Sequence, residues 1–117
     1  MFKCIALLKG KPELTRDQLI EYYETRHVPL IKRLLPGIIS YKRNFIQRDG
    51  GFEFGKTCDF DVVTEIGFAD RESYDRFVAR SADPDVARQI AEDEENVFDR
   101  SASRMYIVDE HVSSFDD

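Results

Sequence analysis

The sequence has few cysteines, no long apolar run and no excess of basic residues. Its apolar segments, such as residues 4–8, are far too short to span a bilayer. Cys4 and Cys58 follow no metal-binding or redox spacing, which predicts reduced thiols in a cytoplasmic protein. A formal net charge of −6 argues against a nucleic-acid partner, because binding to phosphates needs a basic surface. The composition therefore disfavours membrane-spanning and nucleic-acid-binding functions.

Three functional motifs are also missing. No glycine-rich loop of the phosphate-binding kind follows an expected strand, so nucleotide binding is disfavoured. The two histidines, His27 and His111, lack paired metal-ligand spacing, so we expect no metal site and no cofactor. The first residues lack the pattern of a secretory signal peptide, which agrees with a cytoplasmic location.

What the sequence does contain is typical of one globular domain spanning residues 1–117. A chain of this length can bury about two-thirds of its unfolded surface, which is enough for one core. Nine phenylalanines and five tyrosines supply large side chains for that core. Periodicity and turn signals predict strands over residues 2–8, 38–47, 60–68 and 103–112, and helices over 15–35, after 70 and after 83.

Two of these helices have informative details. The first should kink or restart at Pro29, because proline lacks the amide hydrogen that a helix interior needs. The last should begin at Asp83-Pro84, where an N-cap acid precedes a proline at the first helical position. We expect its apolar residues to face inward and the acidic run 92–95 to face outward.

The order strand, helix, strand, strand, helix, strand predicts an α+β fold of the ferredoxin-like split βαβ type. Such a fold has one four-stranded antiparallel sheet with helices on one face. The strand over residues 2–8 is apolar on both faces, so the uncovered face would expose apolar side chains. Monomers rarely tolerate a large apolar patch on their surface. We therefore expect a homodimer that packs sheet against sheet.

His27 is the first candidate for a chemical role. It follows Leu19 and Tyr23 at four-residue spacing, which places it on the apolar face of the first helix. One interpretation is a core histidine whose ring nitrogens bond to backbone groups. The other is a proton shuttle at a cavity, since imidazole is the side chain best suited to proton transfer near neutral pH. Tyr23 on the same face and the disruption at Pro29 favour the second interpretation.

Asp61 and Glu65 lie on one face of the strand over residues 60–68, about 13 Å apart. That separation is too large for a carboxylate dyad. If their face is solvated, both are ordinary surface acids. If it meets the helices, each is a buried acid that needs a partner, and Asp61 could orient His27. Both interpretations stay open.

The strand over residues 38–47 carries Tyr41, Lys42, Arg43 and Asn44. Tyr41 and Asn44 lie on opposite faces of a regular strand, so only one of them should reach the helices. For Lys42 and Arg43 we expect cross-strand pairing at a solvated edge.

Several segments together resemble the EthD-like family, within the dimeric α+β barrel group. The resemblance covers nearly the whole chain and is carried by residues 2–9, 14–19, 22–30, 41–44 and 61–68, of which the segment His27-Val28-Pro29-Leu30 is the most specific. It implies a dimer whose sheets form a barrel, and a hydrophobic cavity between each sheet and its helices with His27 at that cavity. Activities in and around the family include accessory roles in ether degradation and cofactor-free cyclisation, dehydration, decarboxylation or oxygenation of aromatic and polyketide-like molecules. The absence of tryptophan departs from the monooxygenase pattern of this group.

The leading hypothesis is a cofactor-independent acid–base enzyme of the lyase, dehydratase, cyclase or decarboxylase type, acting on a small hydrophobic aromatic or polyketide-like compound. His27 would transfer the proton, Asp61 would orient it, and Tyr41 or Asn44 would bind a developing oxyanion. Tyr23 and Glu65 complete the set of expected ligand contacts. The alternative is a non-catalytic ligand-binding or accessory protein of a catabolic or oxygenase pathway. A third hypothesis is a haem-binding barrel.

Overall fold

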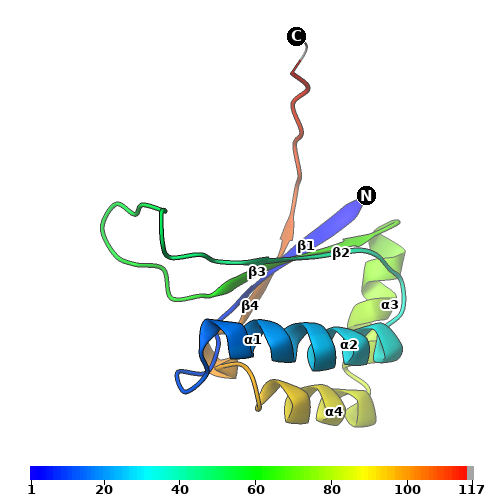
Figure 1. The fold of residues 1–117 in the computed structure, drawn as a ribbon. Coiled ribbons are helices and arrows are strands. Elements are labelled where there is room, and N and C mark those ends of the chain that lie inside the picture. Colours follow the sequence, from blue (N-terminus) through cyan, green and yellow to red (C-terminus); the bar gives the residue numbers. More distant parts are fainter. Residues whose placement is uncertain (116–117) are drawn as a thin grey trace.

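The computed structural model describes residues 1–115 of the chain and forms one sheet with helices packed against it (Figure 1). In chain order the elements are β1 Phe2–Leu8, α1 Arg16–Tyr22, a π-helical turn η1 Tyr23–His27, α2 Val28–Leu34, β2 Ile38–Phe45, β3 Val62–Phe68, α3 Arg71–Ser81, α4 Pro84–Glu94, a short 3-10 turn η2 Arg100–Ala102 and β4 Arg104–Val108. The strands lie in the order β2-β3-β1-β4. All three strand pairs are antiparallel, which confirms the predicted ferredoxin-like α+β fold.

Figure 1 shows α1, α2 and α4 on one side of the sheet. The helix-facing side chains alternate along each strand, with Cys4 paired to Ile66 and Ala6 paired to Thr64. The opposite side, here called the open face, has no described element packed over it in the chain. Its side chains are Lys3, Ile5 and Leu7 of β1, Val63 and Glu65 of β3, Lys42 and Asn44 of β2, and Arg104, Tyr106 and Val108 of β4.

The helix starts follow from the capping residues in the sequence. Thr15 and Gln18 form a reciprocal capping box before α1, in which the Thr15 hydroxyl accepts the Gln18 amide at 3.2 Å. The Asp70 carboxylate accepts the Ser73 amide at 2.8 Å before α3. Asp83 caps α4, with Pro84 at its first position, as predicted.

The predicted irregularity at Pro29 is confirmed, and it takes the form of the π-helical turn η1. The Val28 amide bonds back to the Tyr23 carbonyl, five residues earlier, and α2 then continues the helix with Pro29 in its first turn. A single π-helical turn lets the helix accommodate proline, which has no amide hydrogen to donate to a backbone carbonyl. Tyr23 and His27, at the two ends of this turn, are both buried.

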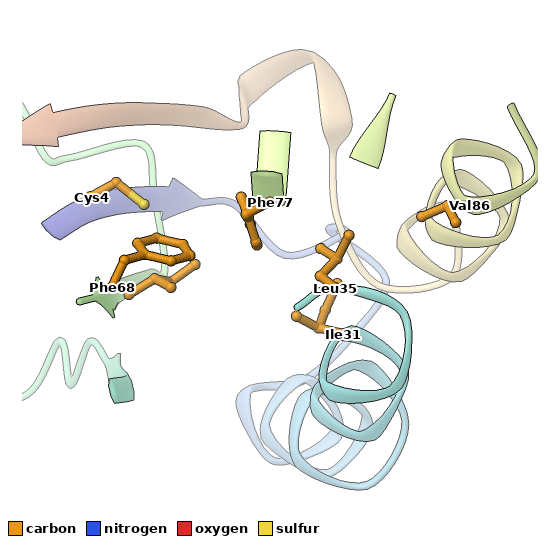
Figure 2. Close-up of a cluster of buried hydrophobic side chains, with 7 residues drawn as sticks. Cys4, Ile31, Leu35, Phe68, Phe77 and Val86 are labelled. Carbon is orange, nitrogen blue, oxygen red and sulfur yellow. The ribbon is translucent and has the colours of Figure 1, made fainter. Parts of the chain in front are cut away.

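Two apolar clusters fill the space between the sheet and the helices. Figure 2 shows the first, which includes Cys4 and Phe68 from the strands and Ile31 and Leu35 from the α2 region. The second includes Leu19, Tyr23 and Phe98, and lies toward the α1 end. Burial raises the pKa of the Cys4 thiol to about 11, so this cysteine packs as a small apolar side chain.

β1 has the predicted bounds, whereas the other three strands are shorter than the sequence predicts. β2 ends at Phe45, β3 begins at Val62, and β4 covers only Arg104–Val108, so residues 46–61 form a long arm between β2 and β3. The register of β2 shifts between Ile38 and Ser40. This bulge leaves Ile39 59% exposed. Among the described residues, no helix combines the length and apolarity needed to cross a membrane.

The packing of α4 can be tested with two valines that both lie within helices. Val86 is 2% exposed and Val78 is 43% exposed. Truncation to alanine changes helix propensity equally at the two sites, but only Val86→Ala leaves a cavity. We expect Val86→Ala to lower the free energy of unfolding by about 2 kcal/mol, and Val78→Ala to change it by less than about 0.5 kcal/mol. Urea denaturation measures both values, and equal effects would contradict this description of the core.

Candidate functional site

His27 lies at the end of η1 with only 4% of its surface exposed. Its Nδ1 atom is 2.6 Å from an Oδ2 oxygen of Asp93, which belongs to α4. Its ring contacts Tyr23 and Phe98 edge-on, with centroid separations of 4.9 and 5.3 Å. The imidazole is therefore fixed by one carboxylate and two aromatic rings, and Nε2 is the nitrogen left to exchange a proton with another group.

The other oxygen of Asp93 is bound as well. The Tyr22 hydroxyl donates to Oδ1 of Asp93 at 2.9 Å, and the side-chain amide of Asn96 donates to the Tyr22 hydroxyl at 3.2 Å. Asp93 therefore joins η1 and α1 to α4 through two hydrogen bonds. Its side chain is only 10% exposed, which strengthens both bonds relative to surface contacts.

Asp61 does not lie beside His27, so the expected pairing of these two residues is wrong. Its Oδ2 oxygen accepts the Gly10 amide at 2.8 Å, and its Oδ1 oxygen accepts Arg48 at 3.1 Å. The reason is its position before the first residue of β3, where its own amide bonds to the Leu8 carbonyl. It lines a small pocket of about 130 Å³ at the N-terminal end of α1, and His27 is not among the lining residues.

Glu65 and Asn44 lie on the open face, away from His27. Lys3 donates to Glu65 at 3.2 Å, and the Asn44 amide donates to Glu65 at 3.1 Å. The hydrogen bond from Lys3 lowers the pKa of Glu65, so its carboxylate is ionised at neutral pH. The strand alternation separates these two candidates from the helix-side site.

Tyr41 is the member of the Tyr41–Asn44 pair that reaches the helices, as the alternation requires. Its hydroxyl and that of Tyr23 are hydrogen-bonding neighbours, and the Tyr23 hydroxyl is also 2.6 Å from that of Thr64. Burial raises the pKa of both Tyr41 and Tyr23. Both phenols therefore stay protonated near neutral pH. Tyr41 can donate a hydrogen bond to an oxygen of a ligand, whereas Tyr23 is only 1% exposed and its hydroxyl contacts Thr64.

Arg43 shares the helix-facing side of β2 with Tyr41, and not the solvated edge that the sequence suggests. Its guanidinium donates through Nε to Glu24 of η1 at 2.8 Å and lies 5.0 Å from the centroid of the Tyr41 ring. The bonds to Glu24 raise the pKa of Arg43, and those to Arg43 lower the pKa of Glu24, so both groups are charged. This pair connects β2 to the π-helical turn that carries His27.

A groove of about 500 Å³ runs between α2 and the edge strand β2. Its lining includes Tyr41 and Arg43 from the strand and Val28, Lys32 and Leu35 from the helix side. A volume of this size is within the range of pockets that hold small organic ligands. Val28, which follows His27 in the chain, lines the groove, whereas His27 itself does not.

Sequence reasoning missed Asp93 because it lies in the acidic run 92–95, which was expected to face solvent. A signal was present, because Asp93 is three residues after Ile90 and four before Val97, both on the inward side of the helix pattern. Glu24 and Lys32 were also missed, because nothing in their local sequence indicates that they lie next to the edge strand β2. No cluster of three or more potential metal ligands occurs within residues 1–115.

Comparisons with known proteins agree with this architecture. The family model described as EthD domain matches residues 11–101. A crystal structure of an ethyl tert-butyl ether d (ethd) family protein from Bacillus halodurans is 22% identical with a TM-score of 0.63, and the match covers 95% of this chain and 100% of that one. HapK from Hahella chejuensis is 11% identical with a TM-score of 0.62, over 100% of this chain and 99% of that one.

A third structure is a mutant of SnoaB, described as a cofactor-independent oxygenase from Streptomyces nogalater. It is 12% identical with a TM-score of 0.57, over 96% of this chain and 94% of that one. No curated protein sequence matches. At these low identities, the solved structures establish the fold.

The contribution of Asp93 can be measured against its exposed neighbour Glu92, whose side chain is 65% exposed. Asp93→Ala removes the carboxylate that accepts from both His27 and Tyr22; the Tyr22 hydroxyl keeps the backbone carbonyl of residue 93 at 3.3 Å, but the buried imidazole loses its partner. We expect a loss of about 2–4 kcal/mol in the free energy of unfolding for Asp93→Ala, and less than about 0.5 kcal/mol for Glu92→Ala. Chemical denaturation of both variants checks this, and a small effect of Asp93→Ala would contradict a structural role for the pair.

Proposed function

The chain belongs to the EthD family, and from its buried His27–Asp93 pair we propose that it is a cofactor-independent acid–base enzyme. Its substrate would be a small hydrophobic aromatic or polyketide-like compound with a carbonyl or phenolic group. The reaction would be of the lyase, dehydratase, cyclase or decarboxylase type. The observation that carries this proposal is a buried histidine fixed by a carboxylate, in a domain whose groove between α2 and β2 is large enough for such a molecule.

In the proposed mechanism the ligand lies in the groove between α2 and β2, with its apolar part against Val28 and Leu35. The phenol of Tyr41 donates a hydrogen bond to the oxygen on which negative charge develops. The Nε2 atom of His27 accepts the proton that leaves the substrate, and Asp93 stabilises the imidazolium that forms. The same proton can return to another atom of the intermediate, so the cycle needs no external oxidant or reductant.

Replacing His27 tests this role directly, and His111 provides a matched control because it is exposed and lies beyond β4. We expect His27→Gln to lower turnover of a responsive phenolic or polyketide-like compound at least about a hundredfold, and His111→Gln to leave it unchanged. Mass spectrometry of a compound panel measures conversion, while circular dichroism confirms that the variants fold. A His27→Gln variant with full activity would remove His27 from the mechanism.

The second candidate function is non-catalytic binding of the same kind of ligand, in an accessory role. One observation favours it: the groove touches Val28, whereas the His27 ring itself is packed between Tyr23 and Phe98. This function predicts saturable binding without conversion, and binding that persists in His27→Gln. The NMR signals of the His27 imidazole distinguish the two functions, because a substrate that reaches the ring shifts them and a ligand confined to the groove entrance does not.

We also propose that the protein is a homodimer whose open faces pack together. The open face carries the half-buried apolar side chains of Ile5, Leu7 and Val63 next to Tyr106, which is 53% exposed. Covering this apolar strip with a second copy removes it from water, which is the usual reason for such a patch. The charged residues around the strip would then lie at or near the interface.

Sedimentation analysis tests the dimer. We expect a mass of twice the 13.6 kDa of one chain for the wild-type protein. Leu7→Asp buries an unpaired carboxylate in the proposed interface, so this variant should sediment as a monomer. Asp17→Asn, an exposed substitution at the start of α1, serves as the control and should stay dimeric. A wild-type protein that is monomeric at every concentration would contradict the proposal.

A further inference from the structure

Two segments outside the sheet carry apolar side chains with almost no cover. The arm, residues 46–61, presents Phe52 and Phe54, which are 83% and 93% exposed. The tail, residues 109–115, presents Val112 and Phe115, which are 83% and 92% exposed. Figure 1 shows the arm extending beyond the strand ends and the tail rising on the side of the sheet opposite the helices. These four apolar side chains are therefore largely uncovered in a single copy.

The base of the arm is held by several contacts, which give it a defined direction. Arg48 donates to the Phe60 carbonyl at 2.8 Å and to the Asp61 carboxylate at 3.1 Å. Arg104, the first residue of β4, donates to Asp59 at 2.6 Å and so connects the arm to the opposite edge of the sheet. A loop held in this way loses less conformational entropy when it binds than a free loop does.

The tip of the arm is also ordered by contacts within it. The Glu53 carboxylate accepts the Cys58 amide at 2.7 Å, which closes the turn between them. The rings of Phe52 and Phe54 meet edge-on with centroids 5.5 Å apart. This aromatic pair is a single apolar surface that projects from the molecule, and aromatic side chains of this kind provide most of the binding energy in protein interfaces.

The tail begins over the open face. Lys3, on β1, donates to Glu110 as well as to Glu65, so the first residues of the tail are bound to the sheet. Val112 and Phe115 follow this anchor in the chain, and both are largely exposed. The tail thus starts on the surface that a second copy would cover and continues past it.

The area of the open face bears on what the arm and the tail contribute to an interface. Four strands about 4.8 Å apart and about seven residues long occupy roughly 450 Å² in outline. A stable, specific interface buries about 800 Å² on each partner. The outline of the face is small, so apolar contacts at its margins would add to the area that a second copy buries.

The charge and the position of the arm and the tail indicate which partner they contact. The open face carries three basic residues and one acidic residue, namely Lys3, Lys42, Arg104 and Glu65. The arm has two basic and four acidic residues, and the tail has two acidic residues and no lysine or arginine. Lys3 and Arg104 already pair with Glu110 and Asp59 of the same copy. The net negative charge of the arm and the tail argues against an anionic membrane as the partner, and the start of the tail over the open face favours a second copy.

We propose that the arm and the tail of each copy clasp the second copy at the margins of the open face, with the Phe52–Phe54 pair and Phe115 buried against it. This inference rests on the proposed homodimer and adds the residues that make it stable. In the proposed dimer each arm lies across the sheet of the other copy. The apolar side chains of the arm and the tail therefore become buried only on assembly.

Sedimentation over a concentration series tests the clasp in the full chain. We expect the arm variant Phe52→Ser/Phe54→Ser to raise the dimer dissociation constant at least about a hundredfold, because the symmetric dimer loses four aromatic contacts. The tail variant Val112→Ser/Phe115→Ser should raise it at least about tenfold. Val78→Ser, an exposed apolar substitution on α3, is the matched control and should leave it unchanged.

A second measurement does not depend on the stability of the variants. The photo-reactive analogue p-benzoylphenylalanine in place of Phe54, in a mixture of ¹⁴N- and ¹⁵N-labelled chains, should give cross-linked peptides that join one labelled chain to one unlabelled chain. Cross-links confined to single chains would overturn the clasp. The clasp would also be overturned if the wild-type protein is dimeric and the arm and tail variants have the same dimer dissociation constant as the wild type. This holds as well if the arm variant loses binding to phosphatidylcholine vesicles, because the arm would then bind lipid and not the second copy. A monomeric wild-type protein would overturn the homodimer itself.

Discussion

The contact between His27 and Asp93 is the interaction on which the candidate site depends. These residues are separated by 66 positions in the chain, and their bond joins η1 to α4. It fixes the orientation of the imidazole, and through Tyr22 it also fixes the distance between the first and last helices of the layer. The edge-on contacts of the imidazole with Tyr23 and Phe98 follow from that position.

A second constraint acts on the other side of the sheet. A four-stranded antiparallel sheet with helices on one face leaves the other face uncovered, and here that face combines apolar side chains with the Lys3–Glu65 pair. The fold therefore separates two kinds of chemistry. The helix side holds the groove and the titratable groups proposed for function, whereas the open face, the arm and the tail hold the surfaces proposed for assembly.

The helix-side site is built from elements that meet only in the folded chain. Tyr41 and Arg43 come from an edge strand, Glu24 and His27 from a π-helical turn, and Asp93 from the last long helix. The Arg43–Glu24 and His27–Asp93 pairs each bridge two of these elements. Neutral phenols, an arginine that is already paired and an oriented imidazole form a site suited to moving protons and stabilising an oxyanion.

The sequence by itself determined the order of the elements, the antiparallel sheet, the helix caps at Thr15, Asp70 and Asp83, the irregularity at Pro29, the family and the inward position of His27. These features depend on local signals such as periodicity, capping residues and the missing amide of proline. Only the tertiary structure decided that Asp93, and not Asp61, faces His27, and that Glu65 and Asn44 lie on the open face. The physical reason is that side-chain partners across elements depend on helix docking and strand register, which place distant residues within a few ångströms and leave almost no local trace in the sequence.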